Sequence, residues 1–380
     1  MVRCTWDRMA IQVAEQTAHP TAVRAGDRVF SSTALRTNRS AGGTKMVAIA
    51  SGSTDRMKAL VQDGSGSADV LHLREIGAPA VTDDRVLVKV HAASVNAADY
   101  HMVHGALIVR VIGKLLRQSR PCPIRGVDVA GVVQAVGKDV TNLRPGDEVF
   151  GMGTGTWAEY ATGTERSLLP KPARLSFVEA GAIGVAALTA LQGLRDHGQM
   201  RPGQRVLIYG AGGGVGTFAV QIAKALEAHV TAVTSTRNMD LVRPLGADEL
   251  VDFTKEDVAK REERYHVILD VAATRSFRDL RRMLVPGGTL VCAGAAKRGG
   301  WLGILARLLA MMFRSRVLRQ RVVFYIASTR REDLAYLKEL IEAGQLRPVI
   351  DRTYPLGEAR EAVRYAMSGQ GRAKVVITMT

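Results

Sequence analysis

The chain has 380 residues, enough for two domains with cores of their own, and its 47% apolar and 23% charged residues are typical of a globular protein. Its three cysteines lie far apart without a C-x-x-C pair, which excludes a disulfide framework and a thiolate zinc cluster and favours a cytoplasmic location. The net charge of +16 would favour anionic partners, but the arginines are scattered and no nucleic-acid-binding motif stands out, so we expect no nucleic acid partner.

Residues 1–56 differ in composition from the rest of the chain. They carry eight Lys/Arg and four Asp/Glu and show no sustained helical or strand periodicity. Three interpretations remain open: a disordered extension, a start assigned upstream of a true first residue at Met57, or a targeting peptide. We predict that this segment is an extension that is disordered or not part of the mature protein.

From Met57 to about residue 175 the pattern is one of short strands and turns, with alternating apolar residues at 86–91 and 126–136. From about 176 to 330, strands predicted at 205–210, 229–234, 266–271 and 288–293 alternate with helices. This βαβ order predicts a parallel sheet with helices on both faces. Residues 374–378 return to strand character.

The most informative stretch is a turn made almost wholly of glycine. It comes after an apolar strand pattern at 206–209 and precedes a helical pattern, and its residues fit the G-x-G-x-x-G spacing with alanine in the first position. Missing side chains let the backbone approach a pyrophosphate, whose charge then rests on the helix N-terminus. We assign dinucleotide binding to Ala211, Gly213, Gly214, Val215 and Gly216. The alternative, a tight turn that binds nothing, is disfavoured by the flanking strand and helix.

The next predicted strand, 229–234, indicates which dinucleotide is bound. NAD-binding proteins usually carry an acid about 20 residues past the glycines for the ribose 2′-hydroxyl. This chain instead has Ser235, Arg237 and Asn238, with no acid. A hydroxyl, a guanidinium and an amide suit a 2′-phosphate, so the sequence favours NADPH. The alternative is that Arg237 is a solvated residue at a helix start.

Residues 297–321 hold seven basic residues and no acidic one, around an apolar run at 301–313. The run is too short to span a bilayer. It could form an amphipathic helix that makes a peripheral membrane contact near a lipophilic acceptor. A substrate-cleft lid or a dimer contact is the more ordinary explanation, since apolar patches mark protein interfaces as readily as membranes, and the choice stays open.

Several co-linear motifs from Met57 to Thr380 resemble the quinone oxidoreductase (zeta-crystallin-like) branch of the medium-chain dehydrogenase/reductase superfamily, which works without zinc. The motifs lie at 93–99, 126–131, 146–151, 186–190, the glycine turn, 245–248, 347–351 and 374–377. The resemblance implies an α/β protein with two domains. A GroES-like β domain would comprise 57–175 with 345–380, and a Rossmann domain with a doubly wound parallel sheet would comprise 176–344. The active site would lie in the cleft between them.

The chain departs from the zinc-dependent branch of that superfamily. There a cysteine, a histidine and a glutamate stand at the positions held here by Asn96, Val127 and Asp128. Because valine cannot bind a metal and the structural-zinc cysteines are absent, we predict no metal site. Without a Lewis acid, the acceptor must already be electrophilic, as quinones and α,β-unsaturated carbonyl compounds are.

Candidate site residues come from the resemblance. Asn96 would donate its amide to the developing oxyanion, Tyr100 would donate a hydrogen bond or a proton, and Thr189 resembles the residue that lies against the nicotinamide. The alternatives are a loop-stabilising asparagine, a tyrosine packed in the cleft wall and an inert helix threonine.

We therefore expect an NADPH-dependent oxidoreductase of quinones or conjugated enones, in the form of a homodimer. The alternative from another class is a basic NADPH-binding protein whose main role is to bind nucleic acid or a membrane.

Overall fold

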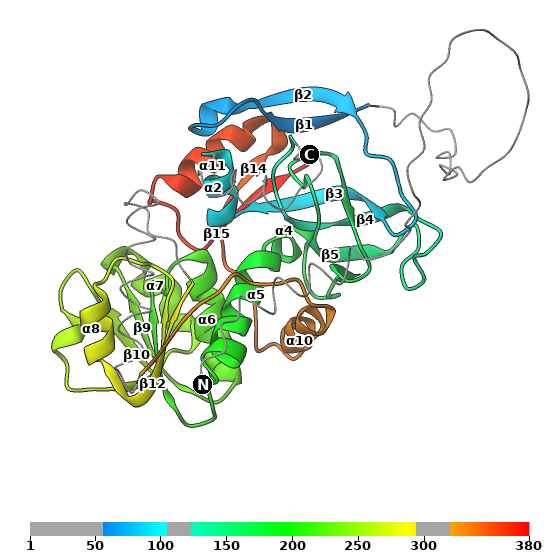
Figure 1. The fold of residues 1–380 in the computed structure, drawn as a ribbon. Helices are drawn as coiled ribbons and strands as arrows, with labels where there is room; N and C mark the ends of the chain where they lie inside the picture. The colour runs from blue at the N-terminus through cyan, green and yellow to red at the C-terminus, as the bar shows by residue number, and fades with distance from the viewer. Residues whose placement is uncertain (1–55, 105–122, 294–319, 380) are drawn as a thin grey trace, which may run out of the picture. The chain divides into compact units, whose positions relative to one another are not determined.

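A computed structural model describes residues 56–104, 123–293 and 320–379 (Figure 1). Apart from Arg56, the extension predicted at 1–56 lies outside the described residues, and so does the apolar run at 301–313. Within the described ranges, no helix is both long enough and apolar enough to cross a bilayer.

The first part of the chain forms antiparallel strands, and the last two strands of the chain join them. The strands are β3 (Val86–Val95), β4 (Asp128–Val136), β5 (Glu148–Met152), β6 (Tyr160–Gly163), β7 (Leu168–Pro170), β14 (Ile350–Pro355) and β15 (Lys374–Thr378). They form a seven-stranded sheet with the order β14-β15-β3-β4-β5-β7, in which β6 also pairs with β3. Strand β15 runs antiparallel to β3, with Val375 opposite Val95.

A hairpin and two helices complete this part. The hairpin pairs β1 (Arg56–Gln62) with β2 (Leu71–Gly77), so the strand pattern begins one residue before the predicted Met57. Helices α2 (Ala97–Val103) and α11 (Ala359–Met367) contact one another. They pack into a core that contains the fully buried Trp157. In β1, Arg56 and Lys58 are exposed, whereas Met57 and residues 59–62 are buried, so most of this strand packs on the protein body.

The middle of the chain forms a six-stranded sheet in which every pairing is parallel. The strands are β8 (Arg205–Tyr209), β9 (His229–Thr234), β10 (Glu249–Asp252), β11 (Tyr265–Asp270), β12 (Leu284–Cys292) and β13 (Arg321–Phe324). Their order in the sheet is β10-β9-β8-β11-β12-β13. This confirms the parallel sheet that the alternation of strands and helices predicts.

The largest difference from a predicted boundary in this sheet is at the start of β12. Strand β12 begins at Leu284 rather than at 288, because Leu284 already pairs with Tyr265 before the register shifts and Thr289 pairs with Val267. The Pro-Gly-Gly turn signal that suggested a later start sits inside this irregular stretch.

Both faces of the parallel sheet are covered. The α-helices of this part are α5 (Gly184–Gln192), α6 (Gly214–Ala225), α7 (Met239–Val242), α8 (Phe277–Arg282) and α10 (Arg331–Glu342), whereas α4 (Phe177–Ala180) contacts β3 and β4 of the antiparallel sheet. In β8, Val206 and Ile208 belong to a core shared with α5, α6 and α10, whereas Leu207 and Tyr209 belong to a second core with α8. Such continuous burial is what a strand in the middle of a parallel sheet requires.

Short helices of other types connect these elements. Five are 3₁₀ turns: η1 (Ala68–Val70), η3 (Thr236–Asn238), η4 (Arg243–Leu245), η5 (Val258–Lys260) and η6 (Leu356–Glu358). The segment η2 (Gly193–His197), which directly continues α5, is a π-helix. Single π turns within helices are rare and occur frequently at functional sites.

Candidate functional site

The glycine turn joins the end of β8 to the start of α6. A Cβ at Gly216 would lie 2.2 Å from the carbonyl oxygen of Gly210 and 2.6 Å from the Cα of Ala211. Only glycine therefore allows the first turn of α6 to lie directly against the loop. Gly213 caps the helix with an extended backbone (φ −92°, ψ 175°), and no side chain hydrogen-bonds to the cap.

This arrangement fits the phosphates of a dinucleotide. The residues at the start of α6 are half-buried: Gly213, Gly214 and Val215. Their backbone N–H groups lie at the N-terminus of this helix, which no side chain caps. The first N–H groups of a helix lack partners within the helix and carry the positive end of its dipole, so they attract a diphosphate. Ala211 is buried at the base of the turn, where its backbone N–H donates to the carbonyl of Val233.

The residues after β9 divide into two groups. Asn238 is buried against the glycine turn, since a Cβ at Gly212 would lie 2.5 Å from its Nδ2. Arg237 is exposed, and its Nη2 donates to the carbonyl of Gly369 at 2.7 Å. Ser235 is half-buried and caps η3. The structure thus leaves Ser235 and Arg237 accessible at the end of β9, whereas Asn238 is buried beside Gly212 of the glycine turn.

Asn96, the predicted oxyanion donor, stands at the N-cap of α2 and belongs to a polar cluster. Its Nδ2 donates to Asp128 Oδ2 at 3.0 Å, and its Oδ1 accepts from Lys374 Nζ at 2.6 Å. These two contacts determine which way the amide points, because only the NH₂ end can face the carboxylate and only the oxygen can face the ammonium.

Asp128 is the centre of this cluster and is fully buried. Its Oδ2 also accepts from the hydroxyl of Ser94, and its Oδ1 accepts from the backbone N–H of Val185 at 2.7 Å. Val185 lies in the first turn of α5, so the carboxylate caps the helix from a distant strand. A Cβ at Gly184 would lie 2.3 Å from Asp128 Oδ1, which explains the glycine at the start of this helix.

Lys374 connects this cluster to the glycine turn. Its Nζ lies 3.2 Å from Asp128 Oδ2, and a Cβ at Gly214 would lie 3.0 Å from its Cδ. Sequence reasoning missed the roles of Asp128 and Lys374. The sequence does contain a signal for Lys374. A lysine at the start of an otherwise apolar strand is expected to be buried with that strand, and a buried ammonium needs a partner.

Asp99 lies one helical turn after Asn96 and closes a capping box with it. The carboxylate Oδ2 accepts from the backbone N–H of Asn96 at 2.8 Å, whereas Oδ1 is buried and has no hydrogen-bond partner among the described residues. Burial raises the pKa of Asp99 to about 7, and the negative charge of Asp128 adds to the effect against the opposing hydrogen bond from Asn96.

Tyr100, the predicted second donor, is half-buried on α2 among histidines. Its ring centroid lies 3.9 Å from that of His104 and 5.5 Å from that of His101. Burial lowers the pKa of His101, and the nearby His104 lowers it further. No hydrogen bond joins Tyr100 to Asn96 or Asp128 in the described part of the chain.

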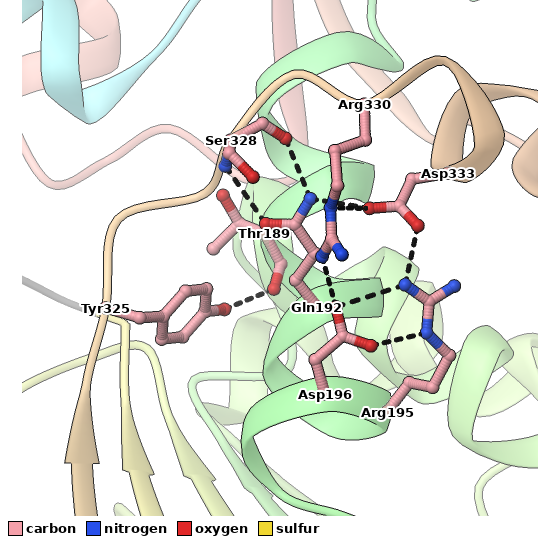
Figure 2. A network of polar contacts seen from close by, with 8 residues as sticks. All are labelled: Thr189, Gln192, Arg195, Asp196, Tyr325, Ser328, Arg330 and Asp333. Atoms are coloured by element: carbon pink, nitrogen blue, oxygen red, sulfur yellow. Dashed lines mark hydrogen bonds and ion pairs between the residues drawn. The ribbon is translucent and has the colours of Figure 1, made fainter. Parts of the chain in front are cut away.

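Thr189, predicted to lie against the nicotinamide, is half-buried on α5, and its hydroxyl donates to the carbonyl of Val185 at 2.6 Å. Its own carbonyl accepts from the hydroxyl of Tyr325, as Figure 2 shows. A Cβ at Gly193 would lie 2.5 Å from that hydroxyl, so glycine at the start of η2 makes room for it. Burial raises the pKa of Tyr325, which keeps the phenol a donor.

Beside the Tyr325–Thr189 hydrogen bond, a separate network of polar contacts joins residues 328–333 to α5 and η2 (Figure 2). Gln192 donates to the Ser328 carbonyl and to Asp333 Oδ2, each at 2.7 Å, and Ser328 N–H donates back at 3.0 Å. Arg195 and Arg330 share the carboxylates of Asp196 and Asp333. Burial alone would raise the pKa of Asp196, but the two guanidinium groups hold it below its usual value. The network joins α5 and η2 to the start of α10.

Of the three positions that correspond to metal ligands in the zinc-dependent branch, two hold side chains of the cluster around Asp128. Asn96 and Asp128 hydrogen-bond to one another and to Lys374, and Val127 offers no donor atom. Within residues 56–104, 123–293 and 320–379, no group of three or more His, Cys, Asp or Glu side chains could hold a metal ion.

Two families of known domains match the chain. Residues 82–173 match the alcohol dehydrogenase GroES-like domain, and residues 245–377 match the family described as zinc-binding dehydrogenase. The first match covers most of the antiparallel part, and the second covers the later strands of the parallel sheet and the C-terminal strands.

Individual relatives agree with the families. The chain is 32% identical over 336 residues to the chloroplastic quinone-oxidoreductase QR1 of Triphysaria versicolor, covering 84% of this chain and 98% of that protein. It is 31% identical over 338 residues to the NADPH-dependent alkenal/one oxidoreductase, chloroplastic, of Arabidopsis thaliana, covering 84% and 79%. Among solved structures, the quinone oxidoreductase from Coxiella burnetii superposes with a TM-score of 0.75 at 28% identity, covering 86% of this chain and 100% of that one.

These matches confirm the predicted family and the predicted fold of a GroES-like domain with a Rossmann-type parallel sheet. The chain belongs to the quinone oxidoreductase branch of the medium-chain dehydrogenase/reductase superfamily, a family of NAD(P)H-dependent oxidoreductases.

Proposed function

We propose that this protein transfers a hydride from NADPH to quinones or α,β-unsaturated carbonyl compounds without the help of a metal ion. The observation that carries the proposal is the position of Lys374, whose ammonium donates to Asn96 and whose Cδ would lie 3.0 Å from a Cβ at Gly214 of the glycine turn. A dinucleotide on the turn would therefore lie within one lysine side chain of the Asn96 amide. The names of the relatives, a quinone oxidoreductase and an alkenal/one oxidoreductase, support the acceptor class.

The chemistry places a negative charge on an oxygen of the acceptor. When bound, NADPH supplies the hydride. One N–H of the Asn96 amide is held by Asp128, so the other N–H is the donor available to the acceptor oxygen. The Lys374 ammonium, 2.6 Å from Asn96 Oδ1, polarises the amide in the direction that strengthens this donor.

A proton must also reach the acceptor. We assign this step to the Tyr100 hydroxyl, which lies on the same short helix as Asn96. The half-buried ring packs on His104, so the helix and the histidine together orient the phenol. A phenol keeps its proton in neutral water and can release it to a stronger base such as an enolate, as a proton donor must.

The preference for NADPH over NADH rests on Ser235 and Arg237. The Arg237 guanidinium donates to a carbonyl, that of Gly369, and no carboxylate of the described residues lies within ion-pair distance of it. Its positive charge therefore stays uncompensated and suits a 2′-phosphate. The hydroxyl of the neighbouring Thr236 donates to Asp252, so we do not assign Thr236 to the 2′-phosphate.

The test measures NADPH oxidation with quinones, enals and saturated ketones as acceptors. We expect turnover with the conjugated acceptors alone, and Asn96→Ala should lower kcat/KM about 10²–10³-fold, as removal of an oxyanion donor does. Absence of turnover with every conjugated acceptor, together with salt-sensitive RNA or vesicle binding, would contradict the proposal and favour a binding role.

A second measurement tests the cofactor preference. Wild-type protein should bind NADPH more tightly than NADH, and Arg237→Glu should abolish the difference by weakening NADPH binding about tenfold to a hundredfold. Equal dissociation constants in the wild type would contradict the preference. The proposal also includes a cytoplasmic homodimer, which cell fractionation and sedimentation-equilibrium measurements of the full chain can test.

A further inference from the structure

A short segment of the chain, residues 369–374, runs along the cofactor site and is called the C-terminal strap. It contacts the glycine turn twice, because the N–H of Ala373 donates to the carbonyl of Gly212 at 2.9 Å and Ala373 forms an isolated β-bridge with Gly213. At its start, the carbonyl of Gly369 accepts from Arg237 at 2.7 Å. The strap therefore spans the distance from the expected diphosphate position to the expected 2′-phosphate position.

Arg372 is the charged residue of the strap at the second of these positions. Its Nη1 donates to the backbone carbonyl of Arg237 at 3.3 Å, so the two arginines are neighbours although they lie far apart in the sequence. Its side chain is 43% exposed, which leaves the guanidinium accessible to a ligand.

Asp351 fixes the backbone of the strap without neutralising this guanidinium fully. The carboxylate is 4% exposed, and its Oδ2 accepts from the N–H of Arg372 and from the hydroxyl of Tyr365, each at 2.8 Å. The nearest guanidinium nitrogen of Arg372 lies 3.8 Å from the other carboxylate oxygen, too far for a hydrogen bond. The Asp351 contacts thus hold the strap in place and leave the hydrogen-bonding capacity of the side chain largely unused.

The Arg372 guanidinium therefore lies against the backbone of η3, the turn that Ser235 caps and that contains Arg237. Guanidinium groups bind phosphate oxygens through paired N–H donors, and two of them can share one doubly charged phosphate. A doubly charged phosphate bound there would be attracted by two positive charges rather than one.

We propose that Arg372 is a second specificity-determining residue for the cofactor, binding the 2′-phosphate of NADPH together with Arg237. The inference rests on the proposed preference for NADPH and adds a residue that comes from the C-terminal end of the antiparallel part. The G-x-G-x-x-G pattern and the residues after β9 gave no sign of it, because the strap reaches the site only through the fold.

The test is a binding titration of the full chain with NADPH, NADH, 2′,5′-ADP and 5′-AMP, which needs no turnover. Arg372→Gln should weaken the binding of NADPH and 2′,5′-ADP about tenfold and leave NADH and 5′-AMP unchanged. Arg372→Glu should weaken the two phosphorylated ligands further. Arg352→Gln is the matched control, since it removes the same charge from an exposed residue whose guanidinium lies over the Tyr365 ring at 4.2 Å.

Three outcomes would overturn the proposal. Equal weakening of all four ligands by Arg372→Gln would show that the residue only holds the strap. Unchanged NADPH binding in that variant, with the wild-type preference intact, would show that Arg237 acts alone. Equal binding of NADPH and NADH by the wild type would contradict the preference itself, and the proposal on Arg372 would fall with it.

Discussion

Lys374 and Asp128 form an ion pair in which both side chains are buried. The Nζ–Oδ2 distance is 3.2 Å, and the side chains are 2% and 0% exposed. Each partner has further hydrogen bonds, from Ser94 and Val185 to the carboxylate and from the ammonium to Asn96. A buried pair becomes tolerable when its remaining polar atoms are satisfied in this way.

Replacing one partner of this ion pair should lower the free energy of unfolding more than replacing both. Asp128→Asn or Lys374→Met leaves one buried charge without its counter-ion and should lower the free energy of unfolding by about 3–5 kcal/mol. The double variant should lose less than the sum of the single losses, because no unpaired charge remains. Urea unfolding of the four proteins measures this coupling.

An exposed ion pair provides the control. Arg144 and Asp147 are 3.5 Å apart with side chains 88% and 29% exposed. Arg144→Gln should change the free energy of unfolding by less than about 1 kcal/mol. If Asp128→Asn proves as mild as this surface variant, the buried cluster does not hold the site together.

Asp99 should make stability depend on pH. Its folded pKa of about 7 lies above the ordinary value of 3.8, so the folded state binds more protons than the unfolded state between these values. Its contribution therefore disfavours folding increasingly as pH rises from about 4 to 7, and the penalty is complete above 7, on the order of a few kcal/mol. Asp99→Asn keeps an acceptor for the Asn96 N–H and removes the titration.

The measurement is urea unfolding of wild type and Asp99→Asn at pH 5 and pH 8. We expect the variant to gain stability relative to wild type on going from pH 5 to pH 8. A difference between the two proteins that is the same at both pH values would show that Asp99 is ionised in the folded state at pH 5 as well.

The sequence predicted the parallel sheet well because its signals are local. Apolar runs such as 206–209, the glycine turn and the βαβ spacing each lie within a few residues of one another. The start of β12 at Leu284 was missed because tertiary pairing with Tyr265 outweighed a turn signal.

The candidate site was predictable only in part. Asn96 and the glycines stand in short motifs, but their partners come from far along the chain: Lys374 is 278 residues from Asn96. Periodicity contains no information on such pairs. Asn238 shows the same limit, because packing under Gly212 rather than its position after β9 decides where its side chain lies.

Gly216 should not tolerate a methyl group. Its Cβ would meet the Gly210 carbonyl at 2.2 Å, and backbone atoms cannot yield as the end of a side chain can. Gly216→Ala should push α6 away from the turn and weaken binding of both NADPH and NADH by about tenfold or more, because the helix N-terminus no longer reaches the diphosphate. Isothermal titration calorimetry measures the loss. Gly357→Ala is the control, since nothing lies within 4 Å of its Cβ position, and it should bind as wild type.

Tyr325→Phe removes one hydroxyl and with it one hydrogen bond to α5, so it should destabilise the protein slightly. The phenol donates to the Thr189 carbonyl, and its loss should lower the free energy of unfolding by about 0.5–1.5 kcal/mol. Tyr336→Phe is the matched control, because this tyrosine packs on the same core and its hydroxyl has no protein hydrogen-bond partner among the described residues. If thermal unfolding shows equal effects for the two variants, the Tyr325 contact does not stabilise α5.

The purified protein should contain no stoichiometric zinc, and chelators should leave its activity intact. Val127 has no ligand atom, while Asn96 and Asp128 already hold the Lys374 ammonium between them. A divalent cation in the same place would meet that positive charge at close range in a buried environment, where repulsion is strong. Elemental analysis before and after dialysis against a chelator, with the reductase assay run on both samples, measures this. One zinc per chain, lost together with activity, would contradict the metal-free mechanism and the role given to Lys374.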